Sequence, residues 1–183
     1  MTDADAFAHA VTRMTGNEQR PDIVLSVAPA PSRLAPYAHA ITAEIGNDPE
    51  LGSGRFVLLH DPAHPASWGS DTRIVVYVEA DIDPEMAEDQ LLTDVGWAWL
   101  QEALAGAEVP FTALGGTVTA VRSTSFEALS ARGHETSIQV RASWSPAGLE
   151  DLADHFSVWI ALMELCAGLA PHHPGVTRIG EIS

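Results

Sequence analysis

The chain has 183 residues, 46% of them hydrophobic, which favours one domain with a sizeable core. Its 25 acidic residues outnumber nine basic ones, all arginine, and the formal net charge is −16. Such a chain has no cationic stripe for phosphate groups, so we expect no direct binding of nucleic acid or of anionic membranes. The single cysteine, Cys166, excludes a disulfide framework. Without an apolar leader or a segment long enough to span a bilayer, the chain is predicted to be cytoplasmic.

Residues 3–46 predict a helix followed by a hairpin. Asp3 is the candidate N-cap of the helix, and Gly16 is its candidate end. Residues 22–27 and 37–45 alternate apolar and polar side chains, which is typical of strands. The proline-rich stretch between them predicts an irregular loop.

The rest of the chain matches itself at a constant offset. Gly54 recurs as Gly116, Val78 as Val140 and Trp97 as Trp159, each sixty-two positions later. The two copies span residues 54–108 and 116–170, and in each copy two strand-like segments precede a helix-like one. This pattern predicts an internal ββα repeat. Residues 55–60 are apolar on both faces, which favours a central strand.

The two predicted helices begin and end alike. Asp83–Pro84 and Ser145–Pro146 each place an N-cap side chain before a proline at the first helical position. Gly106 and Gly168 are the candidate helix ends, and Thr93 marks a break in the first helix.

Together these elements predict a single α+β domain in the order α-ββββ-α-ββ-α, followed by a tail at 171–183. The short connections between strands favour an antiparallel sheet of about six strands with the helices on one face.

One cluster has residue types that bind metals. His60, Asp61 and His64 lie close together, and a third or fourth ligand would have to come from Asp71 or His134. The alternative is a strand end followed by a polar loop, and we expect neither a metal nor a cofactor here.

Catalytic motifs are not recognisable in the sequence. It contains no nucleophile elbow, phosphate-binding loop or dinucleotide fingerprint. Acidic pairs such as Asp81 with Asp83 fall at strand ends and helix starts, where capping and solvation account for them. The sequence therefore favours a protein that is not an enzyme.

Aromatic side chains are the better candidates for binding. Trp97 and Trp99 lie two apart on a predicted helix, so one apolar stripe does not hold both unless it is wide. One of them, together with Trp68 or Trp144, could form an exposed patch that anchors a partner. Arg33 and Tyr37, in and after the proline-rich loop, are further candidate binding residues.

Several stretches also resemble a known family. They are residues 29–38, 54–62, 83–100, 116–119 and 141–144. They resemble DUF3000, a family of short actinobacterial proteins of unknown function, over nearly the whole chain. The resemblance implies an actinobacterial, cytosolic protein and supplies no catalytic or binding residue. The element order is also similar to secretion-chaperone and YbjN-like folds, whose members bind other proteins.

We therefore expect a non-catalytic, cytosolic adaptor or chaperone-like protein that binds a protein partner or forms a homodimer. The alternative is a small-molecule-binding protein or enzyme with a cleft near residues 60–64. An RNA-associated role would have to run through a protein partner, because the chain lacks a cationic surface.

Overall fold

The computed structural model describes residues 1–16, 20–46, 48 and 50–170, so the predicted tail at 171–183 lies outside the described residues. In chain order the elements are α1 (Asp3–Thr15), β1 (Ile23–Ala28), β2 (Tyr37–Ile45), β3 (Ser53–His60), β4 (Thr72–Asp81), α2 (Pro84–Ala87), α3 (Leu92–Ala107), β5 (Phe111–Thr124), the 3-10 helix η1 (Glu127–Arg132), β6 (His134–Pro146) and α4 (Leu152–Cys166).

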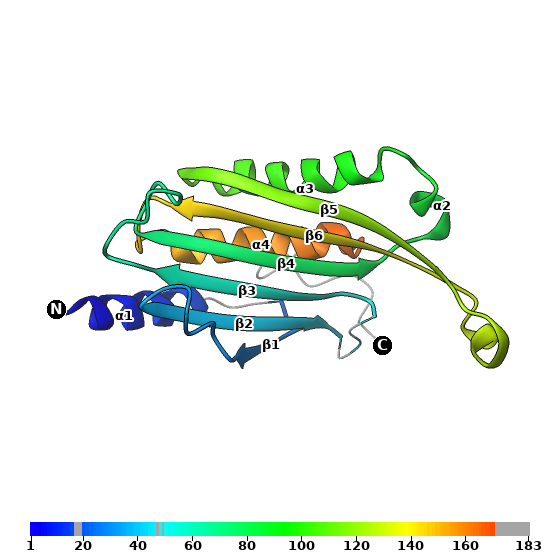
Figure 1. Cartoon of the computed structure of the whole chain (residues 1–183), viewed down its shortest axis with the longest axis horizontal. Coiled ribbons are helices and arrows are strands. Elements are labelled where there is room, and N and C mark those ends of the chain that lie inside the picture. The colour runs from blue at the N-terminus through cyan, green and yellow to red at the C-terminus, as the bar shows by residue number, and fades with distance from the viewer. Residues whose placement is uncertain (17–19, 47, 49, 171–183) are drawn as a thin grey trace, which may run out of the picture.

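The strands of the described residues form one antiparallel sheet in the order β1-β2-β3-β4-β6-β5. Helices α1, α3 and α4 pack on it, as Figure 1 shows. The predicted α+β domain is thus confirmed. Strand β3, apolar on both faces, lies inside the sheet as predicted.

The core lies between the sheet and the helices. Alternate residues of β4 and β6 point into it and meet side chains from α3 and α4. The inward residues of these two strands are Ile74, Val76, Val78, Ala80, Ile138, Val140, Ala142 and Trp144. At the middle of the sheet Val78 pairs directly with Val140. A smaller apolar cluster on the opposite face, around Val57 and Leu59, is covered by the half-buried Trp68.

Several predicted helix ends are corrected by the structure. Thr2, not Asp3, caps α1, because its hydroxyl accepts the Asp5 N–H and the Asp5 carboxylate accepts the Thr2 N–H. Asp83 caps α2 as predicted, but Ser145–Pro146 belongs to β6, and α4 begins six residues after Pro146, at Leu152.

The glycines predicted at helix ends also differ in part from their observed places. Gly106 lies inside α3, which ends at Ala107 with Glu108 in the left-handed conformation. Gly168 does adopt a positive φ, just after α4. Gly116, the counterpart of Gly54, lies within β5, beyond a register shift between Thr112 and Gly115. The predicted break in the first helix is present as the gap between α2 and α3.

Within the described part of the chain, we find no helix with both the length and the apolar character needed to cross a membrane.

Candidate functional site

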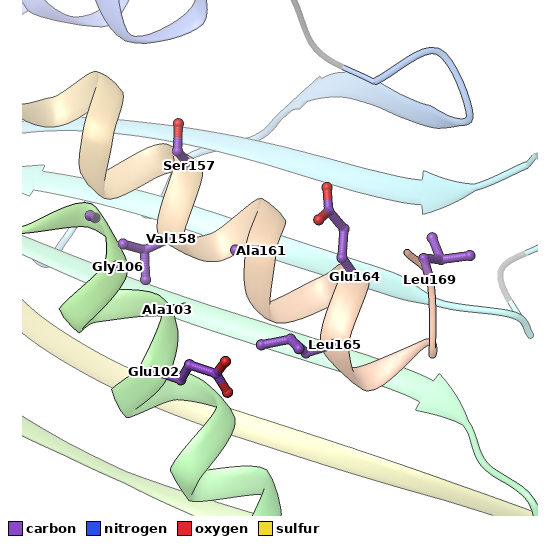
Figure 2. Close-up of a pocket in the computed structure, with 10 residues that line it drawn as sticks. Glu102, Ala103, Gly106, Ser157, Val158, Ala161, Glu164, Leu165 and Leu169 are labelled. Carbon is purple, nitrogen blue, oxygen red and sulfur yellow. The ribbon is translucent and has the colours of Figure 1, made fainter. Parts of the chain in front are cut away.

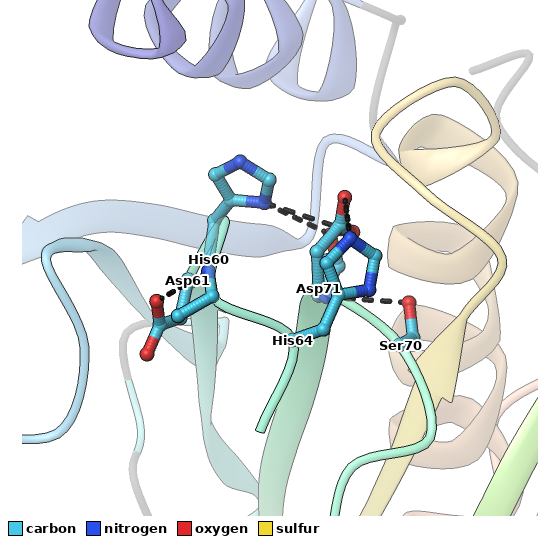
Figure 3. Close-up of polar contacts among 7 residues, drawn as sticks. His60, Asp61, His64, Ser70 and Asp71 are labelled. Atoms are coloured by element: carbon cyan, nitrogen blue, oxygen red, sulfur yellow. Dashed lines mark hydrogen bonds and ion pairs between the residues drawn. The ribbon is translucent and has the colours of Figure 1, made fainter. Parts of the chain in front are cut away.

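The loop after β3 brings two of the three predicted pocket residues together, around Asp71 rather than around Asp61. The Nδ1 atom of His60 lies 3.8 Å from Oδ1 of Asp71, and Nε2 of His64 lies 4.0 Å from Oδ2. Figure 3 shows both imidazoles beside this carboxylate. The Asp61 carboxylate instead accepts the N–H of Ala63 and stabilises the turn. The predicted site is therefore a cluster of His60, His64 and Asp71.

Thr72 links this cluster to the sheet. Its hydroxyl donates to Oδ1 of Asp71 at 2.7 Å and lies 3.2 Å from Nδ1 of His60. Because that hydroxyl donates to Asp71, it accepts the Nδ1 proton of His60. The His60 ring also packs against Phe7 and Tyr37, with ring centroids 6.1 and 6.0 Å away. Tyr37 is thus half-buried in an aromatic cluster beneath α1.

The cluster does not meet the requirements of a metal centre. Among the described residues, no group of three or more His, Cys, Asp or Glu side chains could hold a metal ion. His134, the other predicted ligand, lies on β6, where its Nδ1 is 3.1 Å from the hydroxyl of Thr124. The sequence analysis named Asp71 as a possible third ligand. Its contact with His64 forms only because the loop between β3 and β4 folds back.

The predicted tryptophan patch is not formed. Trp144 is fully buried, and Trp97 and Trp99 are half-buried and pack against the main core. A wide apolar stripe on α3 therefore holds both of these side chains. Trp144 donates its indole N–H to Nδ1 of His155 on α4 at 3.0 Å. Arg33 is exposed in the loop between β1 and β2.

His155 is a buried polar residue that sequence reasoning did not single out. Its Nδ1 accepts from Trp144, so its Nε2 carries the proton, and that atom has no hydrogen-bond partner among the described residues. Burial lowers the pKa of His155 and keeps the ring neutral, although Asp151 and Asp154 oppose the shift. The ring belongs to the core.

An acidic cavity of about 470 Å³ lies at the ends of β4, β5 and β6. The carboxylates of Glu50, Glu79, Asp81 and Glu135 line it. Partial burial and then the neighbouring carboxylates raise the pKa of Asp81. The other lining side chains are hydroxyls and one valine, and the hydroxyl of Ser137 donates to Oε1 of Glu79 at 3.5 Å. Asp83 caps α2, as its position predicted.

A second hollow is apolar and lies on the outer side of the helix layer. Helices α3 and α4 leave a groove of about 400 Å³ between them (Figure 2). Small residues, among them Ala103, Gly106 and Ala161, keep it open. Figure 2 shows Glu102 on the α3 side, directed toward Leu165 of α4.

The most unusual surface is the far end of the β5–β6 hairpin. Strand β4 stops pairing with β6 at Ser137, whereas β5 and β6 continue to pair as far as Thr124 and His134. We call residues 122–136 the arm and residues 125–133 its tip. Figure 1 shows the arm extending away from the body. At the tip, Phe126 and Leu129 are 72% and 52% exposed.

The comparisons with known proteins agree with the resemblance that the sequence suggested. The chain belongs to the family described as protein of unknown function (DUF3000), whose model matches residues 3–177. No curated protein and no solved structure matches the chain.

Proposed function

We propose that this protein is a non-catalytic protein-binding adaptor and that the arm is its binding element. The observation that carries this proposal is the exposure of Phe126 and Leu129 at the end of a hairpin that projects from the sheet. Fully burying side chains of this kind contributes about 1.5–3 kcal/mol each. Paired exposed anchors on a projecting element are typical of a surface that is covered by a partner.

Three residues of the tip are spaced three apart along the chain. The N–H of Leu129 donates to the carbonyl of Phe126 at 3.0 Å, in the i to i+3 pattern of η1. In a 3-10 helix the side chains at i and i+3 eclipse one another. Leu129 and Arg132 lie three apart within η1, and Phe126 is the extended residue just before it, so two exposed apolar residues are followed along the tip by a cation. We call these three residues the tip stripe.

The charge of the arm also supports binding to a protein. Arg122 and Arg132 offset Glu127 and Glu135, so the arm is neutral while the whole chain carries −16. An acidic partner that approaches the neutral arm meets less electrostatic repulsion than it would meet elsewhere on this negatively charged molecule. An unbalanced acidic tip would instead favour a cationic partner through charge alone.

Site-specific crosslinking in the host cell tests this proposal. A photoreactive amino acid in place of Phe126 is expected to give a defined adduct with another protein chain, and Leu129→Ser should remove that adduct. The matched control is the same photoreactive residue in place of Leu34, an exposed apolar residue of the β1–β2 loop. Equal adducts at both positions, or no adduct at the tip, would contradict the proposal.

A second candidate function is small-molecule binding at the cluster of His60, His64 and Asp71. The observation that favours it is the convergence of both imidazoles on one carboxylate. Native mass spectrometry of gently purified protein would then show a fixed extra mass that is lost in Asp71→Asn. A bare chain mass in the wild-type protein would remove this candidate.

We also infer that the two ββα segments are copies of one unit. Three relationships support it. Val78 pairs with its counterpart Val140 at the middle of the sheet. An added Cβ at Gly54 would lie 3.0 Å from Trp159, and one at Gly116 would lie 2.9 Å from Trp97. Each glycine thus faces the tryptophan of the other copy, as a two-fold arrangement requires.

The two hairpins differ in the register with which their strands pair. Gly54 pairs with Val78, whereas Gly116 pairs with Ala142, two residues beyond the equivalent Val140. The register shift between Thr112 and Gly115 lies next to this difference. A likeness to secretion-chaperone and YbjN-like folds stays a proposal that rests on element order alone.

A further inference from the structure

We propose that the tip stripe of one copy docks in the α3–α4 groove of a second copy of this chain, so that the protein assembles through its arms. This inference rests on the proposed function of the arm and names its partner. It joins two surfaces that are otherwise unexplained: an apolar stripe without a covering element, and an apolar groove without an occupant among the described residues.

The two surfaces have matching chemistry. The groove wall is formed largely by alanine, glycine, valine and leucine side chains, which suits Phe126 and Leu129. Small residues let a bulky side chain from another element approach the helices closely. Neither anchor is polar, so their burial leaves no side-chain donor or acceptor without a partner.

The charged end of the stripe fits as well. Arg132 follows the two anchors, and Glu102 stands at the groove. Glu102 makes no ion pair within the described residues. The second carboxylate that lines the groove, Glu164, already lies 3.5 Å from the guanidinium of Arg20. Glu102 is therefore the carboxylate available to Arg132 of an incoming tip.

The arrangement is intermolecular because the tip does not fill the groove of its own chain. Phe126 remains 72% exposed in the single copy. Two bodies of −16 repel one another, but this repulsion is screened over about 8 Å at physiological ionic strength. A neutral arm that extends beyond the sheet offers a contact at which the bodies need not meet face to face.

Charge reversal on each surface gives a decisive experiment. Sedimentation equilibrium over a range of concentrations should show wild-type species heavier than the 19.5 kDa chain. Arg132→Glu and Glu102→Arg should each weaken this association by about 10-fold, because each places like charges together. The double variant R132E/E102R should recover the wild-type association, and so should an equimolar mixture of the two single variants.

Two controls separate docking from folding and from net charge. Glu108→Arg changes the net charge as Glu102→Arg does but lies just beyond α3 and does not line the groove, so association should stay at the wild-type level. Thermal unfolding of each variant should match wild type, because all three positions are exposed.

Several results would overturn the inference. One is a wild-type protein that stays monomeric at all concentrations. Another is an oligomer that both single reversals leave intact, and a third is a double variant that fails to recover. If the tip crosslinks to a different protein while the purified chain is monomeric, the adaptor function stands and the self-docking fails. If the tip gives no specific adduct and the chain is monomeric, both fail.

Discussion

Gly54 on β3 and Trp159 on α4 are packed so closely that no side chain fits between them. A Cβ atom at Gly54 would lie 3.0 Å from Cζ2 of Trp159 and 2.9 Å from the carbonyl oxygen of Tyr77. The indole N–H of Trp159 donates to that same carbonyl at 3.2 Å. The lack of a side chain at Gly54 therefore lets α4 approach the sheet, and the hydrogen bond from Trp159 holds the helix in this position.

The first prediction follows from this contact. Gly54→Ala should lower the free energy of unfolding by about 1–3 kcal/mol, because the methyl group overpacks a site bounded by backbone and indole. Gly106→Ala is the matched control. A Cβ there meets nothing within 4 Å, so alanine should raise helix stability by about 0.5–1 kcal/mol. Urea unfolding of both variants measures the two changes, and equal effects would contradict the packing argument.

The second prediction concerns acid sensitivity. The pKa of His155 is lowered by burial from an ordinary value of 6.5. Its contribution to stability is therefore complete above pH 6.5 and is lost as the pH falls through the lower folded-state pKa. One extra proton taken up on unfolding gives a slope of up to about 1.4 kcal/mol per pH unit.

His155→Gln keeps an acceptor for the indole of Trp144 but does not titrate, so its free energy of unfolding should fall less steeply below pH 6.5. Urea unfolding at a series of pH values measures this slope. His9→Gln, at an exposed position on α1, should retain the wild-type slope. Parallel curves for wild type and His155→Gln would show that His155 does not cause the acid sensitivity.

The third prediction concerns the thiol. Burial raises the pKa of Cys166 to about 12, so almost no thiolate forms at pH 8. A thiol reagent should label native protein only as fast as the chain opens, and should label one thiol at once in denaturant. Rapid labelling of the native protein at pH 8 would place Cys166 nearer to solvent than the structure does.

The fourth prediction concerns Arg20, which links the segment before β1 to the segment after α4. Arg20 is only 6% exposed, and its guanidinium donates to Asp22 at 2.9 Å and to the carbonyl of Ala170 at 2.8 Å. Arg20→Ala should cost about 1.5–3 kcal/mol, because it removes a buried guanidinium together with its charge-assisted hydrogen bonds. Arg13→Ala, which removes one exposed bond to Leu149, should stay within about 0.5 kcal/mol of wild type. Chemical denaturation compares the two, and similar losses would contradict the role of burial.

Local patterns predicted some boundaries and missed others for a physical reason. The pair Asp83–Pro84 starts a helix, whereas the similar pair Ser145–Pro146 does not. The difference is the neighbouring chain: Pro146 pairs with Phe111, and this extends β6 beyond the point where the local signal predicts a turn. Strand pairing supplies hydrogen bonds that the one-dimensional pattern does not contain.

The candidate sites also combine residues that the sequence singles out with residues that only the fold brings to attention. His60 and His64 stand out in the sequence because they are close in it, but Asp71 completes their cluster only when the loop folds back. Phe126 and Leu129 look like ordinary apolar residues. They become a candidate binding surface because β4 stops pairing at Asp81 while the hairpin continues past it.

The sequence by itself determined the order of the strands and most helices along the chain, the inward faces of β4 and β6, and the excess of acidic over basic residues. Periodicity and composition can be read from the sequence of one chain, because neither depends on which residues come into contact. Only the tertiary structure decided which glycine lies under which tryptophan, that His155 is buried against Trp144, and that the tip stripe is exposed. These outcomes depend on contacts between residues far apart in the chain, and contacts of that kind are set by packing and strand register.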